Sequence, residues 1–183
     1  IYTLSKGISW ITFQNECAAI RIDDQLCKQG KGITLYSSFK QNLKGDKMYT
    51  VFEDSEGDEW ILTNKGISII GKKQVDSDFP FQYIKEADGI IYLVSQSDKL
   101  ASYNFKTRQF KFIEIPYHVS MINEVKKFDS NTLLLATDNG LIIYKIKEKE
   151  FQLIDIRTST QPSNVVQSVY QDHYKELWIF PQT

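Results

Sequence analysis

One short phrase returns along this chain at intervals of several tens of residues. Its clearest copy is residues 54–67, DSEGDEWILTNKGI, in which a turn containing Gly57 precedes an apolar stretch and a turn containing Gly66 follows it. Every tryptophan of the chain is followed by isoleucine, at Trp10, Trp60 and Trp178. Self-similarity at a period of about 20 to 50 residues is the signature of a repeat architecture. The repeat therefore constrains the fold before any single residue is considered.

Five copies can be aligned on the tryptophan of the phrase. The aligned residues, which we call the Trp position, are Trp10, Trp60, Tyr92, Leu134 and Trp178. Gly57 and Gly89 stand three residues before this position, and Lys175 takes that place in the last copy. After the apolar stretch, Thr63 and Gly66 correspond to Thr137 and Gly140. Successive Trp positions lie about 42 residues apart on average, which is the period of a β-propeller blade.

The neighbouring stretches have the alternation of β-strands. One stretch precedes the first turn, as at 49–53, another follows the second turn, as at 66–70, and a fourth lies at 110–115 and again at 151–156. Period-two alternation rich in β-branched and aromatic residues indicates strands joined by hairpins. Four strands per repeat predict an all-β chain of β-propeller blades.

We therefore expect a single β-propeller segment, 1–183, made of four-stranded antiparallel blades. The approximate repeats are 1–40, 41–81, 82–120 and 121–160, with a partial repeat at 161–183. Residues 120–127 have some helical spacing, but they occupy the strand slot of their repeat and are predicted to be a strand. In the second turn of its copy, Asn139-Gly140 is expected to supply the positive φ angles of a tight hairpin.

Both ends of the chain fall inside predicted blades. Ile1-Tyr2 aligns with Val51-Phe52, and the chain stops just after the strand of Trp178. We expect about four repeats that form part of a larger propeller. Because blades bury their apolar faces only against neighbours, the end faces should expose core-type residues such as Trp10 and Trp178. Self-association of the isolated chain, or instability, would follow.

Composition and charge exclude several partners. The net charge is −1, and the lysines and arginines are scattered, so there is no basic footprint for nucleic acid. No apolar run approaches the roughly 18 residues that cross a bilayer, and we expect no membrane contact within these residues.

The residues that carry chemistry do not form a recognisable catalytic or metal-binding pattern. His118 and His173 lie in different repeats, with no cysteine or carboxylate at metal-ligand spacing, so we expect no metal, no cofactor and no catalytic residue. Residues 54–59 resemble a calcium loop only faintly and are predicted to be a hairpin turn. If 18–23 is a strand, Cys17 and Cys27 lie on the order of 20 Å apart, which favours free thiols over a bridge that requires a tight bend.

Ligand contacts are harder to assign. The Trp positions could be sugar-stacking platforms, but their replacement by Tyr92 and Leu134 favours a place in the core between blades. Better candidates for ligand contacts are aromatic residues expected in the connecting loops, among which the sequence does not select: Tyr36, Phe39, Phe79, Phe81 and Tyr117.

The phrase D-x-x-G-x-x-W-I-x-T-x-x-G-[IL] resembles the two-component regulator propeller repeat. Residues 49–67 match closely, 166–179 match in part, and 133–144 match in their second half, whereas the first copy lacks the glycine after Trp10. The resemblance covers essentially the whole chain. Competing propeller repeats fit less well, because there is no Trp-Asp dipeptide and no Gly-Gly doublet.

The resemblance implies a function that the residues alone do not. Such repeats form the periplasmic sensor region of hybrid two-component histidine kinase/response regulators, inner-membrane proteins of gut-dwelling Gram-negative anaerobes. These sensors recognise oligosaccharides, and the kinase would lie outside these residues. The implied partners are an oligosaccharide or other small periplasmic ligand and further blades of the same parent chain. Streptogramin lyases carry similar repeats, so a propeller enzyme is the first alternative. A protein-interaction scaffold is the second.

Overall fold

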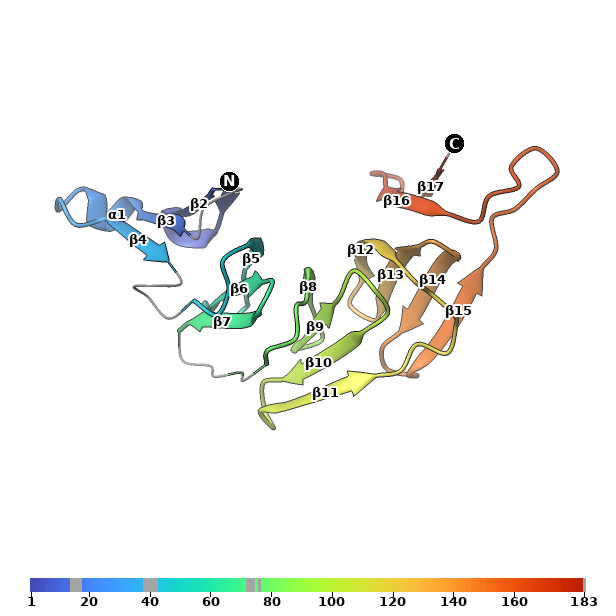
Figure 1. Cartoon of the computed structure of the whole chain (residues 1–183), viewed down its shortest axis with the longest axis horizontal. Coiled ribbons are helices and arrows are strands. Elements are labelled where there is room, and N and C mark those ends of the chain that lie inside the picture. Colours follow the sequence, from blue (N-terminus) through green and yellow to red (C-terminus); the bar gives the residue numbers. More distant parts are fainter. Residues whose placement is uncertain (14–17, 38–42, 72–74, 76, 183) are drawn as a thin grey trace. The chain divides into compact units, whose positions relative to one another are not determined.

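The chain is almost entirely β. A computed structural model describes all residues except 14–17, 38–42, 72–74, 76 and 183 (Figure 1). Within the described residues, the helical segments are a 3₁₀ turn at Ser5–Gly7 and the short helix α1 (Asp24–Cys27). The chain divides into two compact units, Ile1–Gln82 and Tyr83–Thr183. The predicted all-β class is confirmed.

The first unit contains two antiparallel sheets whose strands follow one another in chain order. The first sheet has the order β1-β2-β3-β4 and the second has the order β5-β6-β7. The strands are β1 (Tyr2–Thr3), β2 (Ile8–Thr12), β3 (Ala18–Asp23), β4 (Ile33–Ser37), β5 (Met48–Glu53), β6 (Glu59–Thr63) and β7 (Gly66–Ile70).

The second unit contains three sheets with the same up-and-down connectivity (Figure 1). Strands β8 to β11 form one sheet, β12 to β15 form the next, and β16 pairs with β17. The strands are β8 (Tyr83–Ala87), β9 (Ile90–Val94), β10 (Leu100–Asn104), β11 (Gln109–Ile113), β12 (Ile122–Asp129), β13 (Thr132–Thr137), β14 (Gly140–Lys145), β15 (Glu150–Ile154), β16 (Val166–Gln171) and β17 (Leu177–Pro181).

Two local expectations about helix and strand can be compared with these elements. The segment 120–127 has some helical spacing, but it forms a strand from Ile122 onward, as part of β12 (Ile122–Asp129), as predicted. The helix α1 was not predicted. It is a single turn that begins at Asp23, whose carboxylate accepts the backbone N–H groups of Gln25 and Leu26, each at 3.1 Å. This cap satisfies two of the free N–H groups at the start of the turn.

Strand register puts the Trp positions in matching places. The residue directly opposite each Trp position on the first strand of its sheet lies eight positions earlier in four of the sheets: Tyr2↔Trp10, Phe52↔Trp60, Lys126↔Leu134 and Tyr170↔Trp178. Tyr92 instead pairs with Lys85, because Asp88-Gly89 forms a two-residue turn. Both turn residues have positive φ, 52° and 69°, as a type I′ hairpin requires.

The first turn of the repeat explains why aspartate precedes tryptophan by six residues. One oxygen of Asp54 accepts the backbone N–H groups of Glu56 and Asp58, and the other accepts Nε1 of Trp60 at 2.7 Å. This turn therefore uses its aspartate to hold the ring, which fits a hairpin rather than a calcium loop.

The last copy repeats this arrangement with different residues. Asp172 accepts two backbone N–H groups of its turn and Nε1 of Trp178, the latter at 3.0 Å. The bond to Trp178 is the largest cause of the lowered pKa of Asp172. Lys175 has φ 67°, close to the φ of 85° at Gly57, so a lysine occupies the left-handed position of the glycine.

The second turn is built on a threonine hydroxyl. The Thr63 hydroxyl donates to the Gly66 carbonyl at 2.9 Å, and Thr137 donates to Gly140 at 2.7 Å. Both glycines have positive φ, and a Cβ at Gly66 would lie 2.1 Å from a backbone oxygen. The expected positive φ at Asn139 is wrong: only Gly140 has it, because the Asn139 N–H binds the Thr137 hydroxyl and the turn leaves the positive φ to the glycine.

Burial separates the three tryptophans. Trp10 and Trp60 are completely buried, whereas Trp178 is 52% exposed. The prediction that Trp10 lies on an exposed end face is wrong, because its side chain packs with Val51 and Ile61 of the second sheet. Other apolar residues are exposed on the outer strand of that first sheet, at Ile33 and Leu35, and Trp178 is exposed beside two further aromatics, Tyr170 and Phe180.

Trp60 and Trp178 form a matched pair for a stability test. Each makes the same bond to its own aspartate, but only Trp60 is buried. Trp60→Ala should lower the free energy of unfolding by about 3 to 5 kcal/mol, as for other buried aromatics. Trp178→Ala should cost about 1 kcal/mol or less. Urea unfolding of both variants measures the difference, and equal losses would show that burial does not distinguish the two positions.

Candidate functional site

A buried carboxylate of the first unit ties its two sheets together. Glu59, 4% exposed on β6, accepts Nε1 of Trp10 at 2.6 Å and the guanidinium of Arg21 at 2.7 Å. Trp10 and Arg21 lie opposite each other on β2 and β3, so both donors reach one carboxylate. Leu4 stands where the other tryptophans have their own aspartate, and Glu59 therefore replaces that acceptor. The bond to Glu59 is also the largest cause of the raised pKa of Arg21.

This cluster is a structural tie rather than a reactive site. No buried side-chain nitrogen or oxygen among the described residues lacks a hydrogen-bond partner. Further polar contacts join the same two sheets: the Ser5 hydroxyl donates to Glu53 at 2.6 Å, and the Tyr2 hydroxyl donates to the Tyr49 carbonyl at 2.8 Å. A satisfied buried network fixes the geometry of its surroundings.

Removal of both members of the Arg21–Glu59 pair should cost less than the sum of the two single removals. Among the described residues, Glu59→Leu leaves Arg21 with Asp23, at 3.7 Å, as its carboxylate partner, and the change should cost about 3 kcal/mol or more. The double variant Arg21→Met/Glu59→Leu should be less destabilised than the sum of the single variants, by roughly 1 to 3 kcal/mol.

A double-mutant cycle by urea unfolding measures this coupling. The exposed pair Asp155–Arg157 serves as the control, and its coupling should be much weaker than that of the buried pair. Additive effects at Arg21 and Glu59 would contradict the proposed tie.

The aromatic residues suggested as ligand contacts are mostly part of the packing. Tyr36 was expected in a loop, but it lies on β4. Its ring centroid is 5.0 Å from that of Trp10, and burial raises the pKa of its hydroxyl. Phe81 is completely buried, with its ring 4.9 Å from that of the half-buried Phe79.

The remaining two loop candidates are Tyr117 and Phe39. The half-buried Tyr117 donates its hydroxyl to the Phe151 carbonyl at 3.1 Å. Phe39 lies outside the described residues. The contacts of Tyr36, Phe81 and Tyr117 are therefore packing contacts. The role of these aromatics as ligand contacts stays a prediction.

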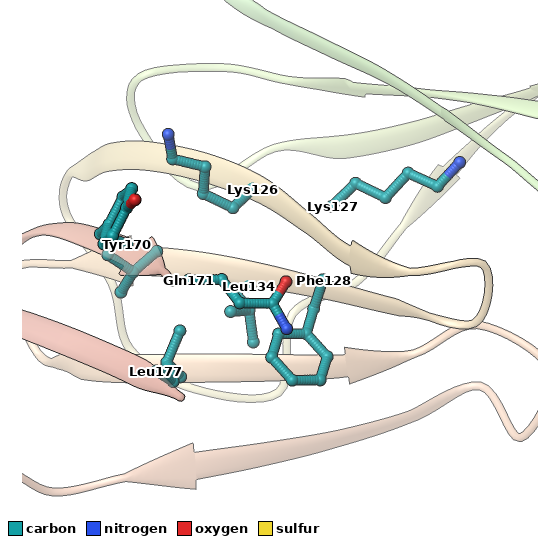
Figure 2. A pocket seen from close by; sticks show the side chains of 8 residues that line it. Lys126, Lys127, Phe128, Leu134, Tyr170, Gln171 and Leu177 are labelled. Carbon is teal, nitrogen blue, oxygen red and sulfur yellow. The ribbon is translucent and has the colours of Figure 1, made fainter. Parts of the chain in front are cut away.

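The second unit has a pocket that the sequence did not predict. It has a volume of about 190 Å³ and lies between the sheet of β12 and β13 and the sheet of β16 and β17. Figure 2 shows Phe128, Leu134 and Leu177 gathered at its apolar side. The full set of lining residues is Lys126, Lys127, Phe128, Leu134, Val169, Tyr170, Gln171 and Leu177. The signal that could have revealed the pocket is the leucine at the Trp position.

The charged groups beside the pocket are directed elsewhere. Figure 2 shows the ammonium ends of Lys126 and Lys127 pointing away from Leu134 and in different directions. Lys126 pairs with Glu124 at 3.1 Å, and Glu124 also accepts the backbone N–H of Val169 at 3.0 Å. Burial, followed by the nearby Lys126, lowers the pKa of Lys85 on β8. Lys85 of β8 and Glu124 and Lys126 of β12 therefore form a charged cluster that also holds the backbone of β16, while apolar side chains form much of the pocket lining.

The described residues do not assemble a metal site or a histidine-based catalytic group. No cluster of three or more His, Cys, Asp and Glu side chains in the described part of the chain could hold a metal ion. The side chains of His118 and His173 are exposed, and the His173 ring packs 3.8 Å from that of Tyr174. Cys27 is an exposed free thiol, and Cys17 lies outside the described residues.

Among the residues that the structure describes, none of the helices is long and apolar enough to cross a membrane.

The fold is that of β-propeller blades, as successive antiparallel sheets and the comparison with solved structures both indicate. No protein-family model matches the chain, and a search of curated proteins also gives no match. Structural similarity covers 97% of the chain in each of the following cases.

The extracellular domain of BT4673 from B. thetaiotaomicron superposes with a TM-score of 0.71 at 20% identity in a structure that describes it as a one-component system. A second structure, which describes it as a hybrid two-component system, gives 0.70 at 18% identity. The extracellular domain of BT3049, described as a hybrid two-component system of the same organism, gives 0.68 at 20% identity. Virginiamycin B lyase from Staphylococcus aureus gives 0.71 at 18% identity. The chain spans 25% and 24% of the two sensor domains and 61% of the lyase.

Proposed function

We propose that this chain is a ligand-sensing, non-catalytic propeller segment in the periplasmic part of a membrane-bound hybrid two-component sensor histidine kinase. The observation that carries the proposal is the structural similarity to extracellular domains of two sensor systems over 97% of the chain. The repeat phrase around Trp60 supports the same class. Kinase activity would reside outside these residues.

The proposed ligand is an oligosaccharide or another small periplasmic molecule. A sensor needs to bind its ligand without consuming it, and the described residues fit this role. Their buried polar groups are engaged in structural bonds such as those of Glu59 and Asp54. Binding segments on propellers are carried by the connections between rigid strands. The contacts would therefore come from the loops that join successive blades.

The runner-up is a propeller lyase, because virginiamycin B lyase has a similar fold. A histidine-to-alanine variant of that lyase is catalytically inactive. In this chain, His118 lies between β11 and β12 and His173 lies between β16 and β17. Within the described residues, neither side chain is hydrogen-bonded to a carboxylate. A general base needs a partner that orients it, which favours the sensor over the enzyme. A pure interaction scaffold is the third possibility.

Two assays on the purified chain separate these classes. Isothermal titration with a panel of oligosaccharides should give saturable binding to at least one, and mass spectrometry should recover that sugar unchanged. Quinupristin, the compound bound in a structure of the inactive lyase, should also be recovered unchanged.

The outcomes of these assays point to different conclusions. Turnover of quinupristin that disappears in His118→Ala or His173→Ala would establish the enzyme and end the sensor proposal. Absence of binding to every sugar would remove the oligosaccharide and favour the scaffold.

We also propose that the isolated chain self-associates. One face of the β16–β17 sheet exposes three aromatic side chains, Tyr170, Trp178 and Phe180, each about half accessible. Monomers seldom leave such patches uncovered, and further blades of a parent chain could cover this one. Light scattering should show association that weakens in Trp178→Ser. A monomer at all concentrations would contradict the proposal.

A further inference from the structure

The two sheets of the first unit can be compared position by position with the last two sheets of the second unit, β12–β15 and β16–β17. In the first unit, Tyr2 pairs with Trp10, and in the second unit Lys126 pairs with Leu134 in the same register. The sheets that follow also match, because Phe52 pairs with Trp60 as Tyr170 pairs with Trp178. Leu134 therefore occupies in the second unit the position that Trp10 occupies in the first.

In the first unit, an indole ring fills the space between the sheets at this position. Trp10 is 0% exposed and belongs to a cluster with Val51, Leu4 and Tyr2. Its Nε1 donates to Glu59. The ring thus lies among residues from the first strand of its own sheet and the first two strands of the next sheet.

In the second unit, the residues at the corresponding positions line the pocket. Counted from the matched register, the counterparts of Leu4, Val51 and Glu59 are Phe128, Val169 and Leu177. The counterparts of Tyr2, Phe52 and Glu53 are Lys126, Tyr170 and Gln171, which also line it. The pocket of Figure 2 is therefore the place of the indole ring, which is left open because leucine is smaller than tryptophan. We call it the Leu134 slot.

The lining of the Leu134 slot favours an aromatic ligand over a charged or strongly polar one. Leu177 replaces Glu59, so the carboxylate that accepts the indole N–H in the first unit is missing here. The side chains of Phe128, Leu134 and Leu177 offer no hydrogen bond and the lysine ammonium groups point away, whereas Figure 2 shows the amide of Gln171 beside Phe128. This amide can pair with a single polar group, and any further polar group that enters such a site loses its hydration without compensation. Apolar cavities of roughly 150 Å³ stay dry and bind small apolar molecules such as benzene.

We propose that the Leu134 slot binds a small planar aromatic molecule of the size of indole. The slot is open to solvent beside Tyr170, which is 56% exposed, so a ligand has access to it. Such a molecule would restore the packing that Trp10 provides in the first unit. The site lies between blades and does not depend on the oligosaccharide proposed above as the sensed ligand.

Saturation-transfer NMR with indole as the probe tests the slot. Wild-type chain should give a saturable indole signal, and Leu134→Trp, which fills the slot from within, should weaken the apparent affinity at least tenfold. Ile33→Trp is the matched control, since it adds the same side chain at a residue that is 69% exposed in the other unit. Its indole signal should equal that of the wild type.

The same experiment distinguishes the remaining outcomes. Circular dichroism first verifies that the variants fold; if Leu134→Trp does not, Leu134→Phe should weaken binding to an intermediate degree, since Tyr92 shows that another sheet carries an aromatic residue at this position. No indole signal with the wild type, or an unchanged signal with Leu134→Trp, would overturn the proposal. A glucose signal that is lost in Leu134→Trp would also overturn it and would make the slot a sugar subsite.

Discussion

The structure depends on one repeated contact, in which the side chain at the Trp position of a sheet inserts between that sheet and the following one. Trp10 does so against Val51 and Ile61, and Leu134 does so against Val166 and Val169. A four-stranded sheet of this size cannot bury its apolar face alone, so stability comes from contacts between neighbouring sheets. The identity of the residue at this position therefore decides how completely each interface is filled.

The polar end of the tryptophan explains the rest of the repeat. An indole N–H that is buried without an acceptor would carry the full cost of its lost hydration. Trp60 and Trp178 use the aspartate of their own turn, which also organises the turn backbone. Trp10 has no such aspartate, and Glu59 of the next sheet accepts its N–H together with the Arg21 guanidinium. A missing local partner is thus replaced by a bond between blades.

Features encoded within a few residues could be read from the sequence, and features that depend on distant residues could not. The turns around Gly57 and Gly66 are held by hydrogen bonds inside one repeat, so the phrase predicted the strands and their order. The burial of Trp10 depends on Glu59, 49 residues away, and the place of Tyr36 depends on Trp10 across the sheet. The helix α1 was not predicted, because a single turn held by one aspartate cap is too short to give a helical pattern in the sequence. The Leu134 slot could not be predicted from the sequence, because finding it requires the strand register of two pairs of sheets.

The functional proposal depends on the fold more than on any cluster of reactive groups. Propeller blades present loops on a rigid support, and this chain adds an apolar slot where one interface is incompletely filled. Sensor domains and a lyase both occur among the solved structures with this fold, and the exposed side chains of His118 and His173 favour the sensor proposal over the lyase. The sensing role and the slot are consistent with each other, since neither requires a residue that the other engages.

The central claim, that the Trp position is a contact between blades, is tested most directly by fluorescence quenching of single-tryptophan variants. Each variant keeps one of Trp10, Trp60 and Trp178 and replaces the other two with phenylalanine. With acrylamide at low protein concentration, Trp10 and Trp60 should be protected and emit at short wavelength, because both are completely buried. Trp178, 52% exposed, should be quenched strongly and emit at longer wavelength. Equal quenching of all three tryptophans in folded variants would contradict the account.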